Sequence, residues 1–549
     1  MKNAFSSWRY GLFVHYVPEA TVDRSGKTVC DLNALADAFD AEGFAEDVAR
    51  MGVEYLIFTA WHYRTVPLYP SEVTKKYRLP EYFCRRDLLG DLLTACEKRG
   101  IPVIFYTHPR DGHDFLPQEQ AALGWATEHP DPASTDPDFA VFDFERWNTY
   151  IRALYLELVQ RYGSRLAGLW LDEGSARGDS WNVVDYPALA AAIDECCPGL
   201  LLMNNFYGDG YGLDTGMKEY HCIWGPMNDR SGGSWPVYDK SVGAVITDSW
   251  VSAAAADACA LRYSPEVLFR YTVLQAAANR QGGGVAWACG PYPGPHADGL
   301  WEKDVLAAMT QLGGLLRSCG GVLGTAPSDA FPLLPGDCFN TVSYGCATVS
   351  ADRKYEYIHI LKQPAGTRLQ LGVPANGAEF LCAEYMDGSP AELVQDETGV
   401  TLTLERPWTA PDTVIRLTVA PGSYGPLPYR MLDDADPALF YSGSWVWEGY
   451  HDSADDYDGA VHRAREAGAD CRTLFTGSRI EILAPHSPAG GSFTVYLDGV
   501  RKGTAVCRSE QTLGRQVIFD SGKLRTGRHR LQLIAEESGA AVDALRIYN

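Results

Sequence analysis

One arrangement of apolar and polar positions recurs through the N-terminal part of the chain. Apolar residues at helical spacing come first, a glycine follows, and a short run of continuously apolar residues comes next. Glycine readily adopts the left-handed conformation that ends a helix, and an unbroken apolar run is typical of a strand buried on both faces. The pattern therefore predicts amphipathic helices that alternate with parallel strands.

Four copies of this unit are present. In the first, Phe44, Val48 and Met51 share a helical face, and VEYLIFTAWH forms the strand after the glycine. The strands of the later copies are IPVIFYTH after Gly100, LAGLWLDE after Gly163 and LLLMNN after Gly199. Helices that alternate with parallel strands form either a doubly wound sheet or a (β/α)8 barrel.

Polar and aromatic side chains gather directly after the predicted strands, which favours the barrel. They are His15, Trp61, His62, Tyr106, His108, Asp172, Glu173, Asn204 and Asn205. Barrel enzymes build their sites at the carboxyl ends of the strands. A doubly wound nucleotide-binding sheet needs a glycine-rich turn after its first strand, and the glycines at 282–284 come too late for that. We expect an α/β fold with a (β/α)8 TIM-like barrel over residues 1–325.

The pattern changes after about Thr325. Stretches of alternating apolar and polar residues, such as YEYIHILKQ and VTLTLERP, are separated by Gly, Pro and Asp turns, as in β-sandwiches. The Pro- and Gly-rich stretch APGSYGPLPYR then predicts a linker. We expect one all-β sandwich over residues 326–425 and a second over residues 432–549.

Composition narrows the choice of partners and compartment. A length of 549 residues exceeds what a single core supports, and a net charge of -23 argues against a nucleic-acid partner or an anionic membrane surface. No apolar run is long enough to predict a membrane span, and no leader-like stretch precedes Trp8. The 14 cysteines include no C-x-x-C pair, which favours reduced thiols in the cytoplasm; a removed leader would indicate secretion instead. The oligomeric state stays open.

A series of segments resembles the α-L-fucosidases of glycoside hydrolase family 29, which are retaining enzymes. The segments are WRYGLFVHY, VEYLIFTAWHY, CRRDLLGDLLTACEKRGIPVIFYTH, YIRALYLELVQRYGSRLAGLWLDEG, RQGGGVAWACGPYPGPHADG and LRSCGGVLGTAP. The resemblance covers residues 8 to about 420. It implies that His15 reaches the sugar from the first strand, that Tyr106 is an active-site tyrosine and that Asp172 is the nucleophile.

Three positions depart from the family pattern. The family's His-His-Asp-Gly becomes His62-Tyr63-Arg64-Thr65, its His-Trp-Gly becomes His15-Tyr16-Val17, and Phe206 stands where an arginine is usual. Because these positions contact the sugar in the family, the resemblance supports the scaffold and the nucleophile more than a particular monosaccharide.

Retaining hydrolysis needs a nucleophilic carboxylate and a carboxylic acid about 5–5.5 Å apart. Side chains alternate along a strand, so Asp172 and Glu173 cannot both point into the barrel mouth. Asp172 is the family match, and the alternative for it is a strand-end residue that caps the next turn. As the acid we favour Glu219 over Asp239 and Asp248, because a glutamate reaches farther; the alternative for Glu219 is a solvated loop residue.

Other strand-end residues are candidates for substrate binding. Sugar hydroxyls would be held by His15, His62, Tyr63 and Tyr106, with His108 as a weaker candidate. The histidines have an alternative as satisfied core residues. The candidates for stacking on a sugar face, or else for filling the core, are Trp61, Trp224 and Trp287. No H-E-x-x-H or comparable spacing predicts a metal site, and the reaction needs no cofactor.

The last segment resembles the galactose-binding-like modules of glycosidases. Trp445, Trp447 and Tyr450 would form a glycan platform there or pack between domains. We therefore expect a retaining, α-L-fucosidase-like exo-glycosidase that acts on an oligosaccharide or glycoconjugate. The alternatives are a retaining glycosidase for another terminal sugar and a non-catalytic glycan-binding protein.

Overall fold

The computed structural model describes residues 2–19, 21–110, 112, 115–125, 143–172, 184–205, 213–220, 243–246, 264–294, 299–301, 304–333, 342–434, 436, 438–448, 456–457 and 460–549. These residues divide into two compact units. The first consists of the described residues up to Thr325 except 273–278, and the second consists of 273–278 and the residues from Ala326 onward. Within the described ranges, no helix combines the length and the apolar character needed to span a membrane.

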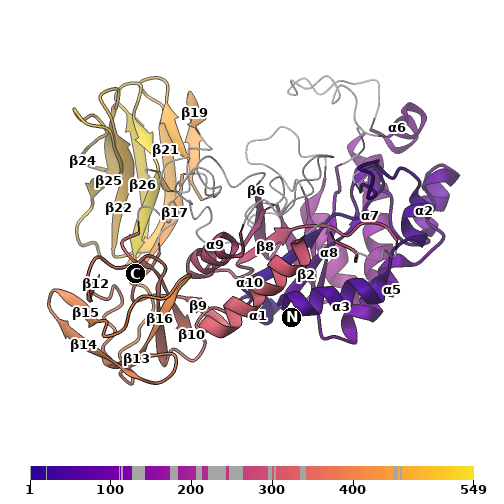
Figure 1. Ribbon diagram of the computed structural model, residues 1–549. Coiled ribbons are helices and arrows are strands. Elements are labelled where there is room, and N and C mark those ends of the chain that lie inside the picture. Colours follow the sequence, from indigo (N-terminus) through magenta and orange to yellow (C-terminus); the bar gives the residue numbers. More distant parts are fainter. Residues whose placement is uncertain are drawn as a thin grey trace. The chain divides into compact units, whose positions relative to one another are not determined.

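Eight parallel strands close into a barrel in chain order (Figure 1). They are β1 (Tyr10–Val14), β2 (Tyr55–Trp61), β3 (Val103–Thr107), β4 (Gly168–Leu171), β5 (Leu201–Asn204), β6 (Thr215–Tyr220), β7 (Gly243–Ile246) and β8 (Val285–Ala288). Each strand pairs with the next, and β8 pairs with β1, where Tyr10 lies opposite Val285. The predicted barrel is confirmed.

Helices alternate with the strands. They are α1 (Lys2–Phe5), α2 (Leu32–Asp37), α3 (Ala41–Met51), α4 (Glu72–Tyr77), α5 (Leu88–Glu97), α6 (Pro117–Leu123), α7 (Phe144–Tyr162), α8 (Tyr186–Cys196), α9 (Pro265–Ala278) and α10 (Val305–Cys319). Several begin at an aspartate cap: the Asp87 carboxylate, for example, accepts a hydrogen bond from the backbone N–H of Gly90 at the start of α5. Such caps satisfy N–H groups that have no partner within the helix.

The glycines that follow the helices do not all have the same function. Gly100 and Gly199 have φ angles of 67° and 78°, in the left-handed region expected of a helix-ending glycine. Gly163 instead has a φ of -52° and begins a short 3-10 turn. A Cβ at Gly163 would lie 2.9 Å from Cγ1 of Val159 and 3.1 Å from Sγ of Cys197. Close packing explains this glycine, and the prediction of a left-handed cap there is wrong.

Large side chains fill the barrel interior. Phe13, Tyr106 and Trp170 belong to one buried cluster, to which β2, β5, β6 and β8 also contribute. Near the amino-terminal ends of the strands, the rings of Trp8 and Tyr55 stack with centroids 5.2 Å apart. Since successive side chains of a strand point to opposite faces, the members of this cluster mark the positions that point inward.

The second unit contains an eight-stranded sheet in the order β12-β15-β14-β13-β16-β11-β10-β9. Its strands are β9 (Thr325–Pro327), β10 (Gly345–Ser350), β11 (Tyr355–Ile360), β12 (Arg368–Gly372), β13 (Phe380–Tyr385), β14 (Pro390–Asp396), β15 (Gly399–Thr403) and β16 (Thr413–Val419). Ile358 of β11, Leu402 of β15 and Leu417 of β16 lie in one buried cluster. Leu369 of β12 and Ala347 of β10, from near the opposite ends of the sheet, lie in the same cluster, so the sheet folds over a common core, as in a sandwich.

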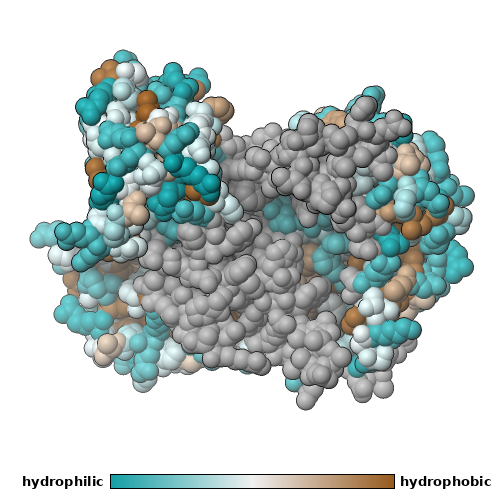
Figure 2. Space-filling model, turned by 90° about the horizontal axis from the view of Figure 1, so that it is seen from above, coloured by the Kyte–Doolittle hydropathy of each residue, from teal (hydrophilic) through white to brown (hydrophobic). Residues whose placement is uncertain are grey.

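The C-terminal module has three sheets around its own core. Its strands are β17 (Tyr429–Asp433), β18 (Phe440–Ser442), β19 (Trp445–Glu448), β20 (Val461–Ala464), β21 (Asp470–Gly477), β22 (Arg479–His486), β23 (Ser492–Leu497), β24 (Val500–Val506), β25 (Leu513–Asp520), β26 (Gly527–Ala535), β27 (Ala541–Val542) and β28 (Ala544–Tyr548). β17 pairs antiparallel with β28, so Tyr429 lies opposite Tyr548 and the first and last strands of the module are neighbours. On the face drawn in Figure 2, the described residues are mainly hydrophilic with scattered hydrophobic ones, which is ordinary for a folded protein.

Candidate active site

Four inward-pointing core residues of the barrel are each followed, two positions along the chain, by a polar side chain. The core residues are Phe13, Tyr106, Trp170 and Met203. The polar residues are His15, His108, Asp172 and Asn205. Because side chains alternate along a strand, each polar side chain points to the same side as its core neighbour. The four polar residues therefore converge on the carboxyl-end mouth of the barrel, where barrel enzymes place their chemistry.

Asp172 follows β4 directly and is the acidic residue of this group. It is buried, with 6% of its surface exposed. The Tyr106 hydroxyl donates to Oδ2 of Asp172, and Nδ2 of Asn205 donates to Oδ1 over 2.7 Å. Nε2 of His108 lies 4.0 Å from Oδ2. Both carboxylate oxygens are therefore held, which fixes one orientation of the carboxylate at the mouth.

Two imidazoles contact the ring of Tyr106, and a third lies beside one of them. The His62 ring stacks on Tyr106 with centroids 5.5 Å apart and planes inclined by 10°, and the His15 ring meets the same tyrosine edge-on at 4.7 Å. The His62 centroid lies 5.0 Å from that of His15 and 5.2 Å from that of His108. Residues at the ends of β1, β2 and β3 thus form one continuous ring cluster beside Asp172.

A threonine hydroxyl sets the protonation of His15. Oγ1 of Thr59 donates its proton to the carbonyl of Val14 over 2.9 Å, so it accepts from Nδ1 of His15, which is 2.6 Å away. Burial, together with the neighbouring imidazoles of His62 and His108, lowers the pKa of His15 well below 6.5. The ring is therefore neutral, its proton is on Nδ1, and Nε2 is the acceptor nitrogen.

The two described strand-end tryptophans of the barrel fill the core. Both are fully buried. Trp61 donates from Nε1 to the carbonyl of His108 and packs edge-on against Tyr155 of α7, because an irregular register near the end of β2 turns it outward. Trp287 alternates with inward alanines of β8 and donates from Nε1 to Oγ1 of Thr272 on α9. Of the two alternatives predicted for these rings, stacking on a sugar or filling the core, their contacts favour the core, since both lie between strands and helices.

In the C-terminal module, the predicted aromatic platform is divided between core and surface. The Trp445 ring stacks on Phe493 with centroids 6.0 Å apart, and its Nε1 donates to the carbonyl of Ser442. Trp447 is 44% exposed. Tyr450 lies outside the described residues. Trp445 is therefore a packing residue, and Trp447 is the ring that reaches the surface.

Some predicted site residues lie outside the part of the chain that the structure describes. They are Trp224, Asp239 and Asp248. The backbone of Glu219 lies on β6 opposite Val245 of β7, two positions after Met217 of the barrel core. Tyr63 lies in the 3-10 turn Tyr63–Thr65 after β2. Among the residues with described side chains, no group of three or more His, Cys, Asp or Glu has the arrangement of a metal site.

Two residues that hold the cluster together were not predicted to act in the site. Asn205 is one of several polar residues that follow a predicted strand, and the sequence signal for its place at the mouth is its position two residues after Met203, which lies in the core. Thr59 lies within an apolar strand, and nothing in the sequence distinguishes it there from a core residue.

His15 should stay uncharged and keep a single tautomer through the physiological pH range. Burial and the two neighbouring imidazoles oppose the cation, and Thr59 keeps the proton on Nδ1. We expect 15N NMR of labelled histidines, with His15 assigned from the His15→Gln variant, to show no titration of His15 between about pH 5 and 8. In Thr59→Val the partner of Nδ1 is lost, and the two tautomers should mix. Titration of wild-type His15 like that of an exposed imidazole would contradict the arrangement.

Comparisons with known proteins relate the barrel to a family. Residues 31–215 match the family model described as Alpha-L-fucosidase. The fold is shared with the structure of an α-L-fucosidase from Bacteroides thetaiotaomicron, at 18% identity and a TM-score of 0.52, over 76% of this chain and 94% of that chain. It is shared also with that of an α-L-fucosidase from Vibrio sp. strain EJY3, at 15% identity and a TM-score of 0.55, over 100% of this chain and 97% of that chain.

Two curated proteins of Flavonifractor plautii match shorter stretches. The A type blood alpha-D-galactosamine galactosaminidase is 31% identical over 106 residues, which are 19% of this chain and 10% of that protein. The A type blood N-acetyl-alpha-D-galactosamine deacetylase is 26% identical over 116 residues, which are 20% of this chain and 14% of that protein. This chain therefore covers only a small part of either relative. The family match over residues 31–215 and the shared fold make the barrel similar to the α-L-fucosidases.

Proposed function

We propose that the chain is a retaining exo-glycosidase that removes a terminal sugar, most readily α-L-fucose, from an oligosaccharide or glycoconjugate. The observation that carries the proposal is the buried carboxylate of Asp172, held at both oxygens by Tyr106 and Asn205 at the barrel mouth. The family match over residues 31–215 includes this aspartate and the strand before it.

In the first step, an oxygen of Asp172 attacks the anomeric carbon, and the bond from that carbon to the leaving oxygen breaks. A glycosyl ester forms on Asp172, and the leaving oxygen takes a proton from the acid residue. Tyr106 and Asn205 favour this step because they orient the carboxylate before the sugar binds, so that little reorganisation is needed during the reaction.

In the second step, the acid residue has become a carboxylate and takes a proton from water. The oxygen of this water attacks the anomeric carbon, the ester bond to Asp172 breaks, and the sugar leaves with its original configuration. We propose Glu219 for this exchange of protons, because it lies on β6 of the same barrel. Asp239 and Asp248 are the alternatives.

The imidazole cluster suits a polyhydroxylated ligand. Nε2 of the neutral His15 can accept a hydrogen bond from a sugar hydroxyl, and the rings of His62 and His108 offer further polar nitrogens within the same cluster. Tyr63 follows His62 directly in the chain and is proposed as a further contact. These groups would orient the sugar so that its anomeric carbon faces Asp172.

Replacing Asp172 with glycine should abolish hydrolysis of an aryl α-L-fucoside, with a fall of about 1,000-fold or more in kcat, because the nucleophile is lost. Azide can enter the space left by the side chain, so it should restore release of the aryl alcohol and give a glycosyl azide of inverted configuration. Release is followed by absorbance and the configuration by NMR. Wild-type enzyme should release its sugar with retained configuration.

The exposed turn residue Asp352 provides a matched control for this substitution. Asp352→Gly should keep wild-type kcat, and circular dichroism should show both variants folded. An Asp172→Gly variant that hydrolyses the aryl fucoside at the wild-type rate would end the proposal.

The acid residue can be identified by the leaving group. An activated aryl group departs without much protonation, whereas an alkyl group does not. Glu219→Gln should therefore lose about 100-fold or more in kcat/KM with an alkyl glycoside and far less with an activated aryl glycoside. Asp239→Asn and Asp248→Asn serve as comparisons and should show no such dependence. If one of these shows the dependence and Glu219→Gln does not, the role passes to that residue.

Two observations require that the identity of the terminal sugar be tested separately from the reaction. Arg64 and Thr65 stand where the family pattern has Asp and Gly, and one curated relative is named for action on alpha-D-galactosamine. A panel of aryl glycosides should give the highest kcat/KM with the α-L-fucoside. A higher value with an α-D-galactosaminide would keep the chemistry and change the substrate. Calorimetric binding without release from any activated glycoside would support the non-catalytic glycan-binding alternative.

A further inference from the structure

The turn that follows His62 has a strained backbone. Arg64 and Thr65 have φ angles of 57° and 43°, in the left-handed region that residues with a Cβ avoid. A β-branched residue such as Thr65 is especially disfavoured there. The family pattern has glycine at this position, which would adopt the conformation without strain. In this chain, other contacts must therefore hold the turn.

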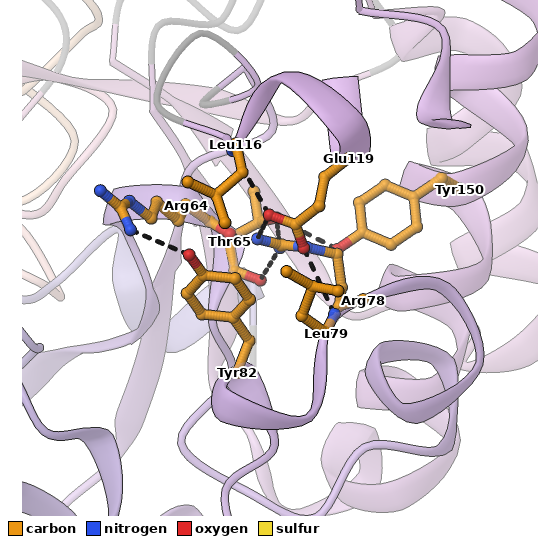
Figure 3. Close-up of polar contacts among 8 residues, drawn as sticks. All are labelled: Arg64, Thr65, Arg78, Leu79, Tyr82, Leu116, Glu119 and Tyr150. Atoms are coloured by element: carbon orange, nitrogen blue, oxygen red, sulfur yellow. Dashed lines mark hydrogen bonds and ion pairs between the residues drawn. The ribbon is translucent and has the colours of Figure 1, made fainter. Parts of the chain in front are cut away.

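A buried ion pair supplies those contacts (Figure 3). The side chains of Arg78 and Glu119 are 0% and 3% exposed, and Nε of Arg78 donates to Oε1 of Glu119 over 2.7 Å. Nη1 of the same guanidinium donates to the carbonyl of Arg64 and to Oγ1 of Thr65. Thr65 Oγ1 is also within 3.1 Å of the Tyr150 hydroxyl. One guanidinium therefore joins the two strained residues to α6.

Aromatic rings complete the enclosure of this guanidinium. Its central carbon lies 3.7 Å from the Phe115 centroid and 4.7 Å from the Tyr82 centroid. Glu119 additionally accepts from the backbone N–H groups of Leu79 and Leu116. Removing two charges from water is costly, and an apolar pair of similar size often gives a fold of equal stability. The presence of a charged pair in this buried place therefore favours a conformational role over a purely stabilising one.

The turn in question fixes the backbone on one side of His62. The N–H of Thr65 donates to the carbonyl of His62 over 2.9 Å. On the other side of His62, the register of β2 against β3 is irregular between Thr59 and Trp61. The pairing of the two strands therefore constrains the backbone less firmly at that end of β2. The direction of the His62 ring, which stacks on Tyr106, consequently depends on the turn.

We propose that Arg78 and Glu119 are positioning residues, which hold the left-handed Arg64–Thr65 turn and through it aim the His62 imidazole at the sugar site. The sugar-binding part of this statement rests on the proposed function. The mechanical part, that the ion pair sets the orientation of His62, does not.

The double variant Arg78→Met/Glu119→Leu separates positioning from stability. Two apolar side chains of similar size should keep the melting temperature close to that of the wild type, since no charge is left unpaired. The turn loses the hydrogen bonds from Arg78, however, so kcat/KM with the aryl glycoside should fall about 10- to 100-fold. The 13C–1H resonance of the His62 ring, assigned from His62→Gln, should shift or broaden.

Thr65→Gly provides the rescue. Glycine takes the left-handed conformation by itself, so in this background the double variant should lose little kcat/KM, and the His62 resonance should stay sharp. A matched control is Arg50→Met/Glu46→Leu, which removes an exposed ion pair from α3 and should change neither readout. If the double variant does not fold, Arg78→Lys gives the same test. Lysine keeps the positive charge, but its single ammonium group lacks the planar set of N–H donors with which Arg78 contacts Glu119 and the turn at the same time.

Each outcome of these measurements either supports or overturns the positioning role of Arg78 and Glu119. Loss of kcat/KM and a disturbed His62 resonance, both relieved by Thr65→Gly, support the positioning role. A double variant with wild-type kinetics and a wild-type His62 resonance overturns it, and so does a loss that Thr65→Gly leaves unchanged. If the wild type hydrolyses no glycoside of the panel, the proposed function fails, and the His62 resonance still decides whether the ion pair holds the turn.

Discussion

Closure of the parallel ladder, from β1 round to β8 and back to β1, is the constraint on which the candidate site depends. Closure gives every strand two neighbours, and a slip of one residue would move all its side chains to the opposite face. The register that buries Trp170 therefore also turns Asp172 into the mouth, and the register that buries Phe13 turns His15 the same way. The core residues of the barrel and the polar residues at its mouth therefore follow from one alternating pattern, in which each polar residue comes two positions after a core residue.

Much of this could be predicted from the sequence because its signals are local. Apolar runs identify strands, helical spacing identifies helices, and the position of Asp172 directly after an apolar run assigns it to the mouth. Trp61 and Gly163 could not be assigned in this way. Trp61 faces outward because of an irregular register, and Gly163 is needed because Cys197, far along the chain, packs against it. Both reasons arise only when distant segments meet.

The contacts that refine the site are likewise long-range. Asn205 and Asp172 are separated by 33 residues, and Arg78 and Glu119 by 41. A single sequence shows that such residues exist and does not show which of them pair. A buried ion pair and a left-handed threonine are each unfavourable alone. Together they are compatible. The Arg64 carbonyl and the Thr65 hydroxyl accept hydrogen bonds from the buried guanidinium of Arg78, and the same hydrogen bonds hold the left-handed turn.

The C-terminal module has its first strand, β17, beside its last strand, β28. The polypeptide consequently enters and leaves this sheet at neighbouring positions, so no internal strand has to be re-threaded when the module is joined to another protein. In evolutionary terms it can be gained, lost or exchanged as a whole by one recombination event.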